Sequence, residues 1–329
     1  MVGLKKQIKD SDFKNIYLFY GEENYLKNHY VEKIKEKVIH KDSELMNCEV
    51  IEKDVDEGYI INSLETLPFL SDRRLVIIKN SSYFGAKSTA SDQLIKVIKD
   101  FPTQTIVIFI EDKIDRRNKF FKAVKSNGYV VEFNYLSEND LAKWVAIELK
   151  RLGKKAEYAT LVHFIRTVGT NMDQIKMELD KLCAYKIEES MISIEDVNEI
   201  ATKTIEFKIF QLVDAMGMKK CEEALIVYNN LLNSNEPPIR ILIMLTRQFR
   251  LIYQIKTLLE EGYNINMAAK KIGVPPFVAK KCMTQGKSFK REVLEEALEE
   301  CLFIDMAIKS GQIKDRLAVE LLLTKYSQR

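Results

Sequence analysis

Five short apolar segments, rich in β-forming residues, recur through the first 135 residues and constrain the fold more than any other feature. They are residues 16–20, 48–51, 75–78, 105–110 and 129–133. Helical patterns separate most of them, and strand patterns nearly vanish after Asn134. Near-continuous apolar strands that alternate with helices are typical of a parallel sheet covered on both faces. The sequence therefore predicts an α/β N-terminal domain.

From residue 137 onward the sequence is patterned for helices. The first expected helices lie around Trp144, at 156–168, at 171–185 and after Ser193. Apolar residues then recur at helical spacing from Phe207 to the end of the chain, and glycines and paired prolines interrupt them. We therefore expect a small helical domain followed by an all-α domain. The predicted boundaries are 1–136, 137–205 and 206–329.

Charge and cysteine usage narrow the class of protein without identifying it. The chain has 51 Lys and Arg against 48 Asp and Glu, and this net charge of +3 neither requires nor excludes a nucleic-acid partner. Its five cysteines lack Cys-x-x-Cys spacing and its three histidines lie far apart, so no metal site is expected. No segment approaches the roughly 18 apolar residues of a membrane span. These features predict a cytoplasmic protein that makes no membrane contact.

The strand, glycine turn and helix that begin at residue 16 invite comparison with a nucleotide-binding domain, but they lack its phosphate loop. That loop reads Gly-x-x-x-x-Gly-Lys-Ser/Thr, because backbone N–H groups and the lysine must hold phosphates. Here Gly21 is followed by Glu22 and Glu23, which put carboxylates where phosphates would lie, and Asn24 is the expected helix N-cap. The sequence at this turn therefore argues against ATP binding.

Two other segments that look like parts of a nucleotide site also fail. Gly286-Lys287-Ser288 matches the end of a phosphate loop, but Lys281 stands where the first glycine is required. Glu111 and Asp112 follow an apolar strand, as magnesium-binding carboxylates do in ATPases, yet they have no nucleotide-bound metal to serve. We expect no catalytic residue and no cofactor.

Residues 67–74 (LPFLSDRR) place two bulky apolar side chains at a turn. The residue before a proline is pushed out of the α region, so the preceding helix should stop near Leu67. Phe69 and Leu70 then either pack under the next strand, as large apolar residues usually do, or stay exposed as anchors for a partner. Arg73 and Arg74 either pin this turn or contact the same partner.

Residues 265–281 are patterned as two helices with Gly273 at the turn between them. A helix-turn-helix of this kind would place Lys280 and Lys281 against a DNA backbone. The second helix has no Asn, Gln or Arg in its first turn to read bases, and helix pairs joined by glycine are common packing units. A DNA-binding regulator is thus the alternative function.

Several segments together resemble the delta subunit of the bacterial DNA polymerase III clamp loader. The resemblance lies in residues 16–23, 67–76, 168–171, 178–182, 245–250 and 305–313, in the same order and nearly from end to end. The closing segment DMAIKSGQI, combined with the Leu67-Pro68-Phe69 step, is the most specific part.

The resemblance implies an AAA+-like architecture without a functional phosphate loop: an α/β domain, a helical lid and a helical collar. It further implies that delta subunits press an apolar pair into a sliding-clamp subunit and thereby release a ring interface. On this sequence the pair is Phe69 and Leu70, and the implied clamp-binding segment also includes Leu67, Pro68, Arg73 and Arg74. This implication favours an exposed pair, with Leu70 where relatives often have a second aromatic residue.

The implied partners are the sliding clamp (beta), the other loader subunits (gamma/tau and delta prime) in a hetero-pentamer held by the collar, and primer-template DNA. Lys309 and Ser310 are the residues we expect near DNA, because a lysine before a Ser-Gly turn suits contact with the phosphate backbone. The resemblance implies no active site of its own, within a holoenzyme that is a nucleotidyltransferase.

Overall fold

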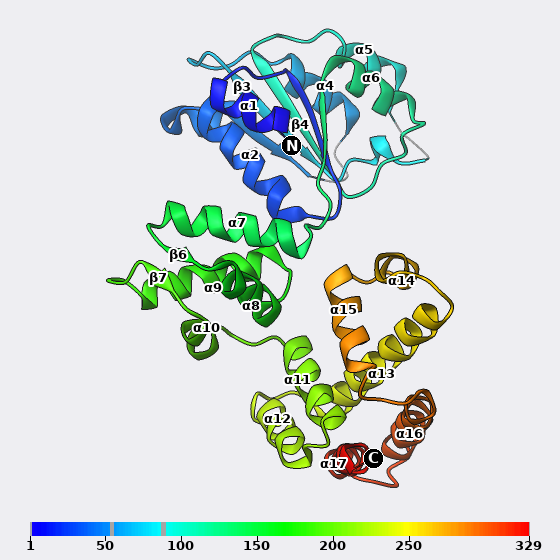
Figure 1. The fold of residues 1–329 in the computed structure, drawn as a ribbon. Coiled ribbons are helices and arrows are strands. Elements are labelled where there is room, and N and C mark those ends of the chain that lie inside the picture. Colours follow the sequence, from blue (N-terminus) through cyan, green and yellow to red (C-terminus); the bar gives the residue numbers. More distant parts are fainter. Residues whose placement is uncertain (1, 53–55, 87–89, 329) are drawn as a thin grey trace. The chain divides into compact units, whose positions relative to one another are not determined.

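The computed structural model describes residues 2–52, 56–86 and 90–328. The chain divides into two compact units, Met1–Leu136 and Ser137–Arg329 (Figure 1). The boundary between these units lies at residues 136 and 137, where the first domain boundary is predicted. The second predicted boundary, near residue 205, falls inside the unit Ser137–Arg329, and the three-domain division stays a prediction.

The first unit is built on a five-stranded parallel sheet with strand order β2-β3-β4-β1-β5. Its strands are β1 (Ile16–Tyr20), β2 (Cys48–Ile51), β3 (Arg74–Lys79), β4 (Thr105–Glu111) and β5 (Tyr129–Glu132). All five expected strands are present within one or two residues of their predicted bounds, and the α/β fold class is confirmed.

Helices cover both faces of this sheet. The helices of this unit are α1 (Val2–Asp10), α2 (Asn24–Val38), α3 (Glu44–Asn47), α4 (Glu57–Glu65), α5 (Asp92–Val97) and α6 (Lys119–Asn127). Leu18 and its same-face neighbours pack against α4, α5 and α6 in one core cluster. On the other face, Phe19 meets Phe133 with ring centroids 5.2 Å apart, and Tyr30 of α2 lies 5.7 Å from the same ring. This alternation along β1 is the period-2 pattern of a strand buried on both sides.

The turn after β1 depends on Gly21. Its φ of +123° is a conformation that side chains disfavour, and a Cβ there would lie 2.3 Å from the Phe133 carbonyl oxygen. The N-cap of α2 is Glu23, whose carboxylate accepts a hydrogen bond from the Tyr25 N–H at 3.2 Å. The expectation that Asn24 caps this helix is therefore wrong by one residue.

The second unit is helical, as expected, apart from a short parallel pair formed by β6 (Lys155–Ala156) and β7 (Met191–Ile192). Its first helices are α7 (Glu138–Arg151), α8 (Tyr158–Val168), α9 (Met172–Tyr185) and α10 (Ile194–Ile200). The remaining ones are α11 (Ile205–Gly217), α12 (Cys221–Asn233), α13 (Pro238–Glu260), α14 (Ile265–Ile272), α15 (Pro276–Gln285), α16 (Arg291–Lys309) and α17 (Asp315–Gln328).

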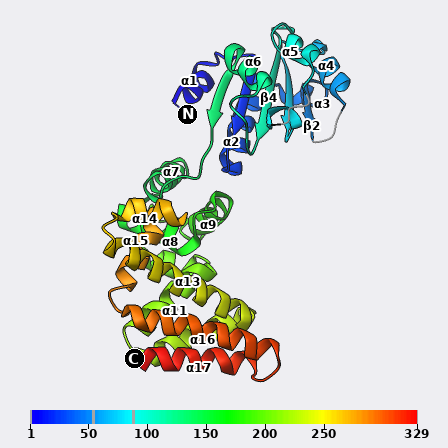
Figure 2. The ribbon, with the colours of Figure 1, turned by 90° about the vertical axis from the view of Figure 1, so that its right-hand side faces the viewer.

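The long helix α13 organises the C-terminal part of this unit. It packs against α11, α14, α15, α16 and α17, and Figure 2 shows α16 and α17 running alongside one another below it. Pro238 occupies its first turn, where the missing N–H costs nothing. Across the described parts of the chain, every helix is too short or too polar to cross a membrane.

Candidate functional site

The turn after α4 exposes its two large apolar side chains. Helix α4 ends at Glu65, and Thr66 in extended conformation leads into the Leu-Pro step, as the sequence predicts. Phe69 is 59% exposed and Leu70 is 90% exposed, and Leu67 beside them is also exposed. Of the two alternatives for this pair, the structure has the exposed one. We call Phe69 and Leu70 the wedge.

A buried asparagine fixes the backbone of the wedge. Asn47, at the end of α3, is fully buried, and its side chain bonds both backbone groups of Phe69. The Phe69 N–H donates to Asn47 Oδ1 at 2.7 Å, and Asn47 Nδ2 donates to the Phe69 carbonyl at 2.9 Å. Leu70 then adopts φ +48°, in the left-handed region that a leucine rarely occupies. Such strained residues cluster at functional sites, where the surrounding structure holds them in place.

The two arginines after the wedge have different surroundings. Arg74 pairs with Glu49 and donates from Nη1 to the Met46 carbonyl at 3.0 Å. Glu49 also accepts a hydrogen bond from the Tyr59 hydroxyl at 2.6 Å, so Arg74 belongs to a network that joins α4, β2 and β3. Arg73 is half-buried and has no hydrogen-bond or ion-pair partner within the described segments. Arg74 therefore pins the turn, whereas Arg73 is available to a partner.

Two more apolar side chains that the sequence reasoning missed lie on α3. Leu45 is 98% exposed and Met46 is 62% exposed, directly before the buried Asn47. The sequence does show two consecutive apolar residues shortly before the strand Cys48–Ile51, but nothing in that pattern indicates that they are exposed. Their nearness to the wedge depends on the contact between Asn47 and Phe69, which are 22 residues apart.

The carboxyl ends of β1 and β4 are where open α/β sheets bind nucleotides, and here a buried lysine occupies that position. Lys27, on α2, is 1% exposed. Its ammonium donates to the carbonyls of Gly21 at 2.7 Å and Glu111 at 3.0 Å, and it pairs with Asp112 at 2.9 Å. This internal cation ties the turn after β1 to Glu111 and Asp112 at the end of β4. Among the described residues, no group of three His, Cys, Asp or Glu side chains is arranged to hold a metal.

Glu111 lies buried beside this lysine. Burial raises the pKa of Glu111 to about 7, although hydrogen bonds from the Ser81 N–H at 2.9 Å and hydroxyl at 2.6 Å oppose the shift. A carboxyl group whose folded-state pKa is raised binds its proton more tightly when folded. Stability is therefore highest at low pH in this window, and it falls as the pH rises from about 4.5 toward 7.

Glu111→Gln should remove this pH dependence. We expect the variant and the wild type to unfold with nearly the same free energy at pH 5, and the variant to be more stable by up to about 3 kcal/mol at pH 8. The measurement is denaturant unfolding of both proteins at the two pH values. A difference between them that does not change with pH would contradict the assignment.

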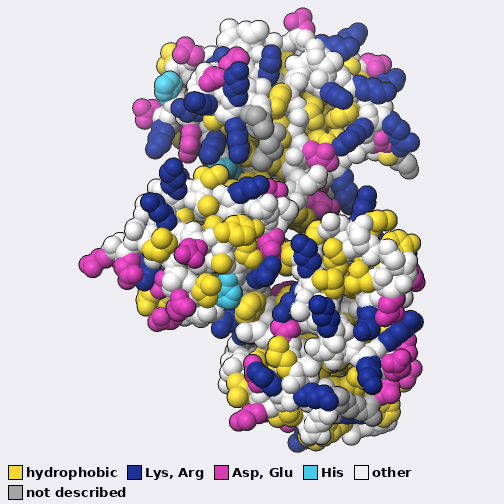
Figure 3. Space-filling model, viewed as in Figure 1, with side chains coloured by type: hydrophobic (Ala, Val, Ile, Leu, Met, Phe, Trp, Pro, Cys, Tyr) yellow, Lys and Arg dark blue, Asp and Glu magenta, His cyan; other side chains and the backbone are white. Residues whose placement is uncertain are grey.

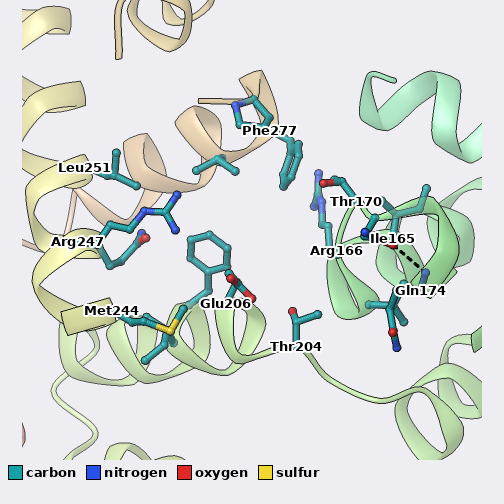
Figure 4. A pocket seen from close by; sticks show the side chains of 18 of the residues that line it. Ile165, Arg166, Thr170, Gln174, Thr204, Glu206, Met244, Arg247, Leu251 and Phe277 are labelled. Atoms are coloured by element: carbon teal, nitrogen blue, oxygen red, sulfur yellow. Dashed lines mark hydrogen bonds between the residues drawn. The ribbon is translucent and has the colours of Figure 1, made fainter. Parts of the chain in front are cut away.

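The second unit contains a cavity of about 710 Å³, lined by α8, α9, α11, α13 and α15. Figure 4 shows Met244, Arg247 and Leu251 facing Arg166 and Phe277 across it. Arg166 is already held by Glu138 through two hydrogen bonds of 2.8 and 3.0 Å. None of the residues predicted as functional lines this cavity.

The lysines predicted near DNA differ in whether an acidic side chain already pairs with them. Lys280 is exposed, whereas Lys281 forms an ion pair with Asp214 at 2.5 Å. Lys309 pairs with Asp305 at 2.6 Å, and the Ser310 hydroxyl donates to the Ala307 carbonyl. On the face seen in Figure 3, basic side chains are interspersed with acidic ones over both units. Contact with DNA at these positions stays a prediction.

The five-stranded parallel sheet, the helical second unit and the missing phosphate loop together define an α/β chain with a helical C-terminal unit that lacks the standard nucleotide-binding motif. Two family models match it. The model "DNA polymerase III, delta subunit" covers residues 17–134, and the model "DNA polymerase III delta subunit, C-terminal domain" covers residues 206–326.

Curated relatives and a solved structure agree with these models. The chain is 28% identical to DNA polymerase III subunit delta of Bacillus subtilis, over 98% of this chain and 96% of the relative. It is 27% identical to the probable DNA polymerase III subunit delta of Aquifex aeolicus, over 79% of this chain and 76% of the relative. The solved Bacillus subtilis DNA clamp loader delta protein superposes with a TM-score of 0.74, at 27% identity, and covers 100% of this chain and 99% of that one.

The chain therefore belongs to the family of DNA polymerase III delta subunits. The C-terminal family model spans residues 265–281, where α14 and α15 are joined through Gly273 in the left-handed conformation. This helix pair is thus accounted for by the delta C-terminal domain, and it gives no separate support to the alternative of a DNA-binding regulator.

Proposed function

We propose that this chain is a clamp-loader delta subunit that binds the sliding clamp through the wedge and opens the ring, or holds it open, for loading onto primed DNA. The observation that carries the proposal is an exposed apolar pair on a fixed backbone: Phe69 and Leu70 are solvent-exposed while Asn47 holds the Phe69 peptide groups. Apolar anchors that enter a partner's pocket supply most of the binding energy of protein interfaces. A fixed backbone also lowers the entropy lost on binding.

The wedge acts by differential binding. If Phe69 and Leu70 bind the clamp more tightly when the interface between its ring subunits is open, binding shifts the clamp population toward the open ring. The shift is limited by the difference in affinity between the two clamp states. No ATP is consumed by this subunit, which agrees with the missing phosphate loop and with the Lys27 ammonium at the carboxyl ends of β1 and β4.

The neighbours of the wedge have separate roles. Leu67 and Pro68 extend the apolar surface and direct the chain out of α4. Arg73, which has no partner among the residues the structure describes, contacts the clamp. Arg74 stabilises the turn from behind through Glu49.

The remaining parts serve the assembly. Residues 137–205 act as the lid, and residues 206–329 as the collar that joins the gamma/tau and delta prime subunits in a hetero-pentamer. The loader places the clamp on primer-template DNA in the cytoplasm, and Lys280, Lys281, Lys309 and Ser310 lie near that DNA. The holoenzyme is a nucleotidyltransferase, and this subunit contributes no catalytic residue.

The test is release of a clamp from DNA. Clamps from the same genome would be trapped on nicked circular DNA, and the purified chain would be added with and without ATP. We expect faster clamp release in its presence, at a rate that ATP does not change. Calorimetric titration with the free clamp provides the binding measurement, and absence of binding there would contradict the proposal.

A further inference from the structure

We infer that the surface that contacts the clamp has a second apolar arm on α3, formed by Leu45 and Met46. This inference rests on the proposed function of the wedge and deepens it. We call Leu45 and Met46 the α3 arm. Both side chains are exposed, at 98% and 62%, in a helix of only four residues.

Hydrogen bonds hold the α3 arm and the wedge in a fixed position relative to each other. Asn47, the residue after the arm, bonds the N–H and the carbonyl of Phe69 at 2.7 and 2.9 Å. Arg74, which follows the wedge, donates to the Met46 carbonyl at 3.0 Å. The wedge itself, at Phe69, and the chain after it, at Arg74, are thus both tied to α3.

The sheet places the two arms on the same edge. Helix α3 leads directly into β2 (Figure 2), and the wedge leads into β3, which pairs with β2 in parallel. Cys48 lies opposite Leu75 in this register, so both arms project from the amino ends of neighbouring strands. This edge is opposite to the one where Lys27 lies, at the carboxyl ends of β1 and β4.

Composition and continuity point to the clamp as the occupant of this surface. Single exposed leucines are ordinary, but here Leu45, Met46, Leu67, Phe69 and Leu70 are all exposed, and hydrogen bonds fix the backbone at Phe69 and at the Met46 carbonyl. Phe and Met are enriched in protein interfaces, and charged residues are depleted from the centres of interfaces. Because the α3 arm is continuous with the wedge, a partner that receives Phe69 also covers Met46.

The variant Leu45→Ala/Met46→Ala tests the inference, because alanine keeps the helical propensity of α3 while it removes the apolar side chains. In calorimetric titration with the clamp we expect affinity to fall at least about tenfold, as for interface anchors. The single variant Met46→Gln, which is similar in size and polar, should weaken binding in the same direction. Tyr135→Ala is the matched control: Tyr135 is exposed beyond β5, at the opposite side of the sheet from β2, and its loss should leave affinity unchanged.

The outcomes separate this inference from the function on which it rests. If the α3 variants fold with wild-type thermal midpoints and bind the clamp like the wild type, while loss of the wedge abolishes binding, the α3 arm is excluded and the wedge stands. If the wild type does not bind the clamp, both fall. If sedimentation shows that the α3 arm instead mediates pairing of two copies of this chain, and clamp affinity is unaffected, the inference is overturned in favour of self-association.

Discussion

Replacing Phe69 and Leu70 together with serine will lower affinity for the sliding clamp by about 100-fold or more without unfolding the chain. Burial of a large apolar side chain contributes about 1.5–3 kcal/mol, and each 1.4 kcal/mol changes affinity about tenfold. Two such side chains that are exposed in the free chain and covered in the complex therefore account for an effect of this size. Titration calorimetry of the wild type and the double variant measures it directly.

The same exposure explains why the fold should survive. Phe69 and Leu70 lie outside the core cluster of the first unit. The Asn47 side chain bonds the backbone of Phe69, and a serine at that position keeps this backbone. Circular dichroism and the thermal midpoint should therefore match those of the wild type. Tyr135→Ser removes an exposed aromatic side chain elsewhere in the same unit and should bind normally. A double variant that keeps wild-type affinity would exclude the wedge as the clamp anchor.

The order and type of the elements were predictable because their signals are local. The run Ile16–Tyr20 is apolar at every position and ends at Gly21, and β1 occupies those residues. The pair β6 and β7 was missed because strands of two residues have too few positions to show a period. The N-cap of α2 was misplaced because Glu23 and Asn24 both carry side-chain oxygens suited to the role, and the backbone geometry decides between them.

The candidate site was only partly predictable because exposure depends on contacts across the chain. The sequence identifies Phe69 and Leu70 as large and apolar at a turn, which by itself favours burial. In the folded chain they are exposed, and a side chain 22 residues earlier, Asn47, holds the Phe69 backbone at the turn. The same contact brings Met46 into the surface, and no periodic pattern encodes it.

Lys27 is the clearest case of chemistry that a pattern cannot reveal. It lies on α2, where a lysine would ordinarily be placed in solvent, yet it is almost fully buried with three oxygen partners. A buried ammonium of this kind is stable only because each proton has an acceptor. Its replacement by methionine leaves the Gly21 and Glu111 carbonyls without that donor while the volume of the side chain is nearly kept.

Because Lys27→Met removes the donor to two carbonyls and breaks a partly exposed ion pair, it should destabilise the first unit by about 3 kcal/mol, which corresponds to a fall in its thermal midpoint of about 10 °C. Lys37→Met, which removes an exposed lysine from the same helix, should change stability by no more than about 0.5 kcal/mol. The measurement is denaturant unfolding, with hydrogen exchange of β1 and β4 peptides to assign the loss to the first unit.

Asp112→Asn separates the contribution of the Lys27–Asp112 ion pair to stability from that of the two carbonyl contacts of Lys27. Asp112 is largely exposed, so its ion pair with Lys27 is screened by water and should contribute at most about 1 kcal/mol. The carbonyl partners of Lys27 are buried, and they should account for most of the effect. If Asp112→Asn instead costs as much as Lys27→Met, the ion pair dominates and the carbonyl contacts do not. Because Lys27 and the wedge lie at opposite edges of the sheet, Lys27→Met should still bind the clamp with wild-type affinity at temperatures where it is folded.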